Sequence, residues 1–100
     1  MPEKKALQVY WTSLALEKAI EIKKYISKAF SEREVNAYLE LLKSFETAIS
    51  IYPALYPETS KKAKIRRAVL NKNLSVFYRI FKDRIEVLMV LDNSFIIPPL

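Results

Sequence analysis

The sequence predicts an α+β fold in which a helical hairpin packs on one face of a four-stranded, antiparallel-rich sheet. Residues 63–91 form three apolar runs separated by short polar breaks at 71–73 and 82–84. These breaks are too short for crossover helices, so they favour an antiparallel meander. Residues 13–50 show two helical patterns joined by almost no loop, which favours an antiparallel helix pair. The expected element order is β-α-α-β-β-β in two layers.

The first half of the chain is predicted to form one strand and both helices. Residues 6–11 are short, β-branched and aromatic, which is typical of a strand. Thr12 or Ser13 then caps the first helix, and the run 31–34 has the form of a capping box that begins the second. The apolar stripes at helical spacing are Ala15, Ala19, Ile22, Ile26 and Ala29, and then Val35, Leu39, Leu42, Phe45 and Ile49.

The second half is predicted to contain only strands. Two Tyr-Pro pairs, at 52–53 and 56–57, end the second helix, because the residue before proline disfavours the helical region. After a connection at 52–62, strands are expected at 63–70, 74–81 and 84–91. In the last strand, alternation predicts that one face carries Ile85, Val87, Met89 and Leu91, and that the other carries Glu86, Leu88, Val90 and Asp92.

Composition limits the class of protein and the chemistry. We expect residues 1–100 to form a single domain with a modest core. The sequence has no Cys, which fits a cytoplasmic location. It also has no His and no Gly, so it lacks the commonest general base and metal ligand as well as any Gly-rich phosphate loop. No metal or cofactor is expected, and no uncharged run is long enough to span a membrane.

Positive charge is concentrated around the predicted sheet. The net charge is +6, and the segment 58–82 holds eight basic residues against one acidic residue. This concentration favours an anionic partner, such as nucleic acid or an acidic protein segment. The alternative is a solvated sheet edge, where lysines oppose aggregation. The candidate target-binding residues are Lys62, Lys64, Arg66, Arg67 and Arg79.

The orientation of these residues depends on which side of the third predicted run faces the helices. If Ile65 and Val69 face the hairpin, Lys64 and Arg66 point to the open face. Arg67 then lies on the opposite face and has to snorkel or pair at the margin.

Other candidates give weaker signals. Aromatic residues at 77, 78 and 81 could stack on bases beside Arg79, or could pack in the core. The acidic residues Glu58, Asp83, Glu86 and Asp92 form no convincing catalytic pair. The apolar tail at 94–100 could mark a partner surface or fold back over the sheet.

The order of several short motifs resembles the RelE/ParE toxin superfamily. The resemblance begins with Trp11-Thr12-Ser13-Leu14-Ala15 and the later Tyr25-Ile26, and it continues through the proline-bearing loop at 52–57. It then includes Ile65-Arg66-Arg67, Val76-Phe77-Tyr78-Arg79-Ile80 and Ile85-Glu86-Val87-Leu88. It ends with Leu91-Asp92-Asn93 before a proline, and therefore covers nearly the whole chain.

The resemblance implies a bacterial toxin of a type II toxin–antitoxin module, such as a plasmid-stabilisation toxin, which a cognate antitoxin protein neutralises. One branch of the superfamily cleaves messenger RNA in the ribosome, using basic residues on the open sheet face. The other branch poisons DNA gyrase. Either branch implies a protein without a membrane anchor, acting as a homodimer or in a toxin–antitoxin hetero-oligomer.

The nuclease residues of the superfamily are only partly present. Lys64 and Arg66 match basic positions, but nucleases usually carry arginine where this sequence has Ser75 and, after the last strand, Ser94 and Phe95. The tail has no Tyr or His. RNA cleavage by the 2′-hydroxyl needs a base, an acid and charge stabilisation. The sequence therefore favours a ParE-type gyrase poison. A RelE-type endoribonuclease that relies on Lys64, Arg66 and Arg79, and a non-toxic binding module that keeps the fold, remain alternatives.

Overall fold

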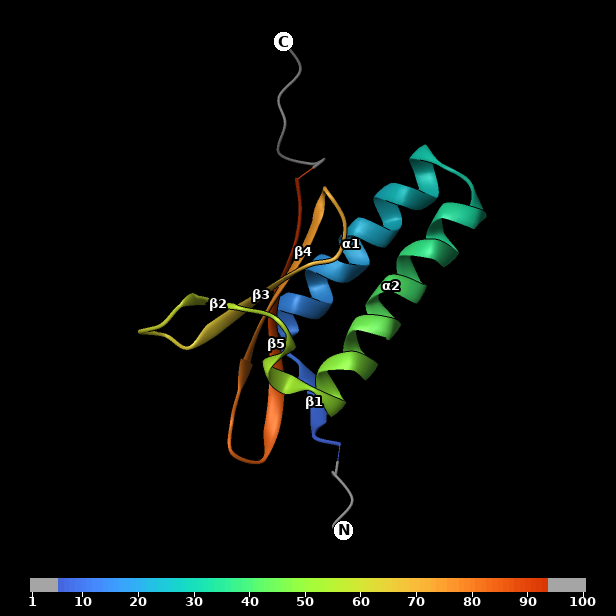
Figure 1. Cartoon of the computed structure of the whole chain (residues 1–100). Helices are drawn as coiled ribbons and strands as arrows, with labels where there is room; N and C mark the ends of the chain where they lie inside the picture. The colour runs from blue at the N-terminus through green and yellow to red at the C-terminus, as the bar shows by residue number, and fades with distance from the viewer. Residues whose placement is uncertain (1–5, 94–100) are drawn as a thin grey trace.

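The computed structural model describes residues 6–93 as two helices packed on one face of a five-stranded sheet (Figure 1). In chain order the elements are β1 (Gln8–Trp11), α1 (Ser13–Ala29), α2 (Glu32–Ile51), the 3-10 helix η1 (Pro53–Leu55), β2 (Glu58–Ser60), β3 (Ile65–Val69), β4 (Leu74–Ile80) and β5 (Arg84–Asp92). The two-layer α+β prediction is confirmed, but the sheet has five strands instead of four.

The additional strand is β2, which lies inside the predicted connection. Its three residues, Glu-Thr-Ser, carry no apolar alternation that would indicate a strand. It forms because β3 supplies an antiparallel partner, with Glu58 opposite Arg66 and a register shift before Ser60. This short strand occupies one edge of the sheet.

The strand order is β1-β5-β4-β3-β2, so the first strand and the last strand of the chain are neighbours. β1 runs parallel to β5, and the other pairs are antiparallel. The crossover from β1 to β5 includes both helices, as a parallel connection requires.

The helix starts follow the predicted caps. The Thr12 hydroxyl accepts a hydrogen bond from the backbone N–H of Ala15 at 3.1 Å and donates to the carbonyl of Leu88 at 3.3 Å. The cap of α1 is therefore also tied to β5. At the start of α2, the backbone N–H of Ser31 donates to Glu34 Oε2 at 3.1 Å, as a capping box predicts.

The core lies between the helices and the sheet. Both helix stripes contribute, except that Tyr38 is buried where Leu39 was expected and that Ala29 is exposed. The Tyr38 hydroxyl donates to the carbonyl of Ala19 at 2.8 Å, which links the two helices. At the other end of α2, an edge-on aromatic cluster joins the elements, with ring centroids of Phe45 and Tyr78 5.7 Å apart. Such pairs are worth about 0.5–1.5 kcal/mol beyond area burial.

A bulge in β5 changes which side chains reach the core. Phe77 pairs with Met89 while the next residue, Tyr78, pairs with Val87, so Leu88 has no partner on β4. As a result Val87 and Val90 are both buried, although strict alternation placed them on opposite faces. The predicted alternation for this strand is therefore wrong beyond Val87.

Candidate functional site

The face of the sheet opposite the helices carries the candidate site, and we call it the open face. Residues that pair across the strands share a face, so alternation away from the buried core defines its members. They are Gln8, Tyr10, Ile65, Arg67, Val69, Ser75, Phe77, Arg79, Arg84, Glu86, Met89 and Leu91.

Arg67 lies on the open face, in the middle of β3. Its Nε donates to Ser75 Oγ at 3.3 Å, and its guanidinium lies over the ring of Phe77, 5.8 Å from the centroid. The backbone register places Arg67 opposite Phe77. The side chain is therefore held flat along the sheet with part of the guanidinium available to a partner.

Arg79 is the second arginine on this face, and it is exposed. It lies two residues after Phe77 on β4, so Arg67 and Arg79 are diagonal neighbours on adjacent strands. Its guanidinium lies 5.0 Å from the centroid of Phe81. Within residues 6–93 neither Arg67 nor Arg79 forms an ion pair.

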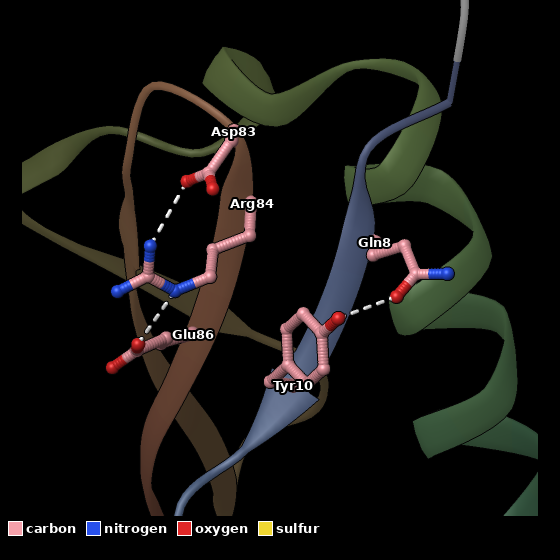
Figure 2. A network of polar contacts seen from close by, with 5 residues as sticks. All are labelled: Gln8, Tyr10, Asp83, Arg84 and Glu86. Atoms are coloured by element: carbon pink, nitrogen blue, oxygen red, sulfur yellow. Dashed lines mark hydrogen bonds and ion pairs between the residues drawn. The ribbon is translucent and has the colours of Figure 1, made fainter.

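A third arginine, Arg84, has its charge engaged (Figure 2). Its Nε donates to Glu86 Oε2 and its Nη1 to Asp83 Oδ1, both at 2.9 Å. These hydrogen bonds, to Glu86 first and then to Asp83, raise the pKa of Arg84. The guanidinium also covers Phe81, 4.4 Å from the ring centroid, so Phe81 contacts both Arg79 and Arg84.

The polar cluster around Arg84 faces β1 across a hollow in the open face. On β1, the Tyr10 hydroxyl donates to Gln8 Oε1 at 2.6 Å (Figure 2). Gln8, Tyr10, Arg84 and Glu86 line this hollow, whose volume is about 510 Å³. Sequence reasoning did not include these four among the binding candidates. The signal for finding them is the parallel pairing of Tyr10 with Glu86, which needs the register of the first strand.

Arg66 does not lie on the open face, so the expected orientation of β3 is wrong. Arg66 pairs with the fully buried Tyr78, and residues directly opposite share a face, so its side chain lies on the helix side. There its Nη1 donates to the carbonyl of Tyr56 at 2.6 Å. The reason is that Ala68, not Ile65 or Val69, is the β3 residue that packs into the core.

Lys62 and Lys64 lie in the turn between β2 and β3, and both are exposed. Lys64 has a φ of 56°, the left-handed region that glycine favours, in a chain without glycine. The predicted cluster is therefore divided. Arg67 and Arg79 share the open face, the two lysines lie in a turn, and Arg66 lies on the helix side of the sheet.

The aromatic candidates are also divided between the two faces. Tyr78 belongs to the core, where its hydroxyl donates to the carbonyl of Pro53 at 2.6 Å and where burial raises its pKa. Phe77 and Phe81 are half-buried and lie under the arginines. The acidic candidates form no metal-binding group within the described part of the chain, and no helix of residues 6–93 has the length and apolar character needed to cross a bilayer.

The comparisons with known proteins agree with this architecture. A model of the ParE toxin of the type II toxin–antitoxin system parDE matches residues 9–96. No curated protein sequence matches the chain.

Solved structures of low sequence identity share the fold. A chain of the chromosomal ParDE system from P. aeruginosa superposes with a TM-score of 0.72 at 12% identity, covering 87% of this chain and 96% of that one. A chain of the E. coli DinJ-YafQ toxin–antitoxin complex gives a TM-score of 0.59 at 8% identity, with coverages of 93% and 99%. Because the family model spans nearly every described residue, this chain belongs to the ParE toxin family of type II toxin–antitoxin systems.

Proposed function

We propose that this toxin acts by binding, that its target is DNA gyrase, and that a cognate antitoxin protein holds it inactive. The observation that carries the proposal is the make-up of the open face. It presents Arg67 and Arg79 beside aromatic rings, while Glu86 and the adjacent Asp83 are engaged with Arg84. Arginine and aromatic side chains are the groups that most often dominate protein interfaces.

The same face is poorly equipped for proton transfer. RNA cleavage needs a group that accepts a proton and another that donates one. The sequence has no histidine. On the open face the Tyr10 hydroxyl donates to Gln8 and Glu86 accepts from Arg84, whereas Tyr78 is buried on the helix side with its hydroxyl bound to the carbonyl of Pro53. This arrangement supports the interpretation of the open face as a docking surface and not as a nuclease centre.

The antitoxin is expected to cover apolar surface on the helical layer. Leu16, Ile20 and Leu39 are 48%, 51% and 40% exposed. Large patches of exposed apolar residues often indicate a surface that binds a partner protein. The P. aeruginosa and E. coli neighbours are both toxin–antitoxin systems, which supports an antitoxin partner here.

A RelE-type, ribosome-dependent mRNA endonuclease is the second candidate. The diagonal pair Arg67 and Arg79 could hold a phosphodiester, and Phe77 or Phe81 could stack on a base. In that case the arginines would stabilise the charge of the transition state without a histidine.

Induced expression followed by two readouts separates these candidates. We expect growth arrest, inhibition of supercoiling by purified gyrase and intact cellular messages in primer extension. Codon-positioned cuts in the messages with normal supercoiling would replace the gyrase proposal with the nuclease. Healthy growth at high expression would favour a binding module without toxicity.

The variant Arg67→Ala with Arg79→Ala tests the open face. We expect growth arrest to be lost and inhibition of gyrase to weaken at least ~10-fold, because arginine is enriched among the interface residues whose truncation costs about 2 kcal/mol or more. Lys24→Ala with Lys43→Ala is the matched control, because it removes two exposed positive charges from the helices. Equal loss in both variants would indicate a general charge effect and contradict a specific open-face site.

A further inference from the structure

Arg79 and Glu86 carry opposite charges at directly opposite positions of the open face. The register of β4 and β5 pairs the two residues, and opposite charges at such positions attract each other. Within residues 6–93, however, no ion pair joins them. The exposed Arg79 thus has a carboxylate as its cross-strand neighbour and does not bind it.

The reason is that Arg84 already holds this carboxylate. Arg84 lies two residues before Glu86 on β5, so their side chains share a face. The Nε of Arg84 donates to Glu86 Oε2 at 2.9 Å (Figure 2). The carboxylate of Glu86 is therefore bound along its own strand and not across to β4.

Two further contacts fix Arg84 in this position. Its Nη1 donates to Asp83 Oδ1 at 2.9 Å, and its guanidinium lies 4.4 Å from the ring centroid of Phe81. Phe81 stands opposite Arg84 at the end of the hairpin, where its backbone N–H donates to the carbonyl of Arg84 at 2.8 Å. Hydrogen bonds between charged groups are stronger than neutral ones, so two carboxylates and a ring hold one guanidinium.

The ring of Phe81 brings the two arginines close to each other. The guanidinium of Arg79 lies 5.0 Å from the same centroid. Two positive groups that share a ring repel each other, and the carboxylates of Asp83 and Glu86 offset the charge of Arg84. Arg79 therefore stays beside the ring, with no carboxylate of residues 6–93 on its N–H groups.

We propose that Arg84 is a positioning residue, which holds the carboxylate of Glu86 and so keeps Arg79 available to an anionic group of the target. Loss of Arg84 releases Glu86, which then pairs with Arg79 across the strands and withdraws it from the docking surface. The part of Arg79 in target binding rests on the proposed function, whereas the competition of the two arginines for Glu86 does not.

Modification by phenylglyoxal tests this competition without the target, because a guanidinium that is paired with a carboxylate reacts more slowly. In Arg84→Gln we expect Arg79 to react at least ~2-fold more slowly than in the parent chain, as the strength of an exposed ion pair allows. In Arg84→Gln with Glu86→Gln the rate should recover. The rates are measured by mass spectrometry of peptides from the full chain, after circular dichroism has shown that each variant is folded.

Recovery in the double variant separates positioning from a general structural effect, because both variants lack the ring contact of Arg84. Lys18→Gln is the matched control. It removes another cation that is paired with a carboxylate, on α1, and it should leave the rate at Arg79 unchanged. Arg67, which has no carboxylate opposite it on β4, is the internal reference in every digest.

An unchanged rate at Arg79 in Arg84→Gln would overturn the proposal, as would a slow rate that persists in the double variant. If Arg84→Gln does not fold, Arg84→Met takes its place, because it keeps an unbranched side chain over Phe81. A double-mutant cycle of Arg79→Ala and Glu86→Ala, read by urea denaturation, needs no reagent. Coupling between the two residues should appear only when Arg84 is replaced.

Gyrase inhibition, measured on the same variants, distinguishes this proposal from the proposed function. Inhibition should weaken in Arg84→Gln and recover in the double variant. A slow rate at Arg79 with unchanged inhibition would contradict the proposed role of Arg79 in gyrase binding and would still support its positioning by Arg84. All substitutions lie within residues 6–93, and the predicted apolar tail at 94–100 lies outside the described residues.

Discussion

Arg66 and Arg67 are consecutive residues with different environments. Arg66 lies on the helix side and binds the carbonyl of Tyr56, whereas Arg67 lies along the open face beside Phe77. Both were reasonable binding candidates from charge alone. Which of the two faces outward depends on whether Ala68 or Val69 packs in the core, and the short run at 65–69 does not distinguish these alternatives.

This difference predicts opposite phenotypes for two neighbouring substitutions. Arg66→Ala should lower the free energy of unfolding by about 1–2 kcal/mol, because it removes a charged hydrogen bond to a half-buried carbonyl. Arg67→Ala should cost less than about 1 kcal/mol, since it removes an aromatic contact and a longer hydrogen bond. Urea denaturation measures both changes.

Target binding should show the reverse order. Arg67→Ala should weaken gyrase inhibition more than Arg66→Ala, when both proteins are assayed without urea at a temperature at which they are fully folded. A larger loss of inhibition in folded Arg66→Ala would contradict the assignment of the two faces.

Among the elements, the helices were predictable because their signals are local. Thr12 and Ser31 mark the helix starts, and each apolar stripe needs only its own helix. β2 was not predictable, because its polar residues form a strand only when β3 is present beside them. The bulge at Leu88 was also not predictable, since it results from pairing between β4 and β5.

The capping box of α2 should give a pH-dependent contribution to stability. Hydrogen bonding by the Ser31 side chain is the main cause that lowers the pKa of Glu34 from its ordinary value of 4.5. A lowered pKa in the folded state stabilises the fold at pH values above the unfolded pKa, and this stabilisation is lost as the pH falls. Glu34→Gln should therefore lower the melting temperature at pH 7, with a difference that shrinks on acidification below about pH 4.

Glu32→Gln is the control for that experiment. It removes a negative charge from the same first turn but leaves the contact between Ser31 and Glu34 in place, so it reports the interaction with the helix dipole alone. An equal effect of both substitutions at every pH would contradict a specific role for the capping box.

At the scale of the whole molecule, Trp11 reports how β1 joins the rest of the fold. It is the one tryptophan in the chain, and its indole N–H donates to Glu46 Oε1 on α2 at 2.8 Å. Val9 and Trp11 pack against the core from β1, and Val9 pairs with the buried Ile85. The fluorescence of Trp11 therefore reports the docking of the edge strand on both layers.

We expect the fluorescence of Trp11 and the far-UV circular dichroism to change at the same urea concentration, because small domains usually unfold in one cooperative step. Val9→Ser should shift both transitions together to lower urea. An earlier change in fluorescence alone would show that β1 detaches before the helices and the other strands unfold.

The pairing of β1 with β5 also has a consequence for synthesis. During synthesis from the amino terminus, residues 8–11 are made long before their strand partner at 84–87. The growing chain can form both helices early, whereas it cannot complete its sheet until residues 84–87 have left the ribosome. The nascent domain is therefore expected to stay incomplete, and without activity, until that segment has emerged.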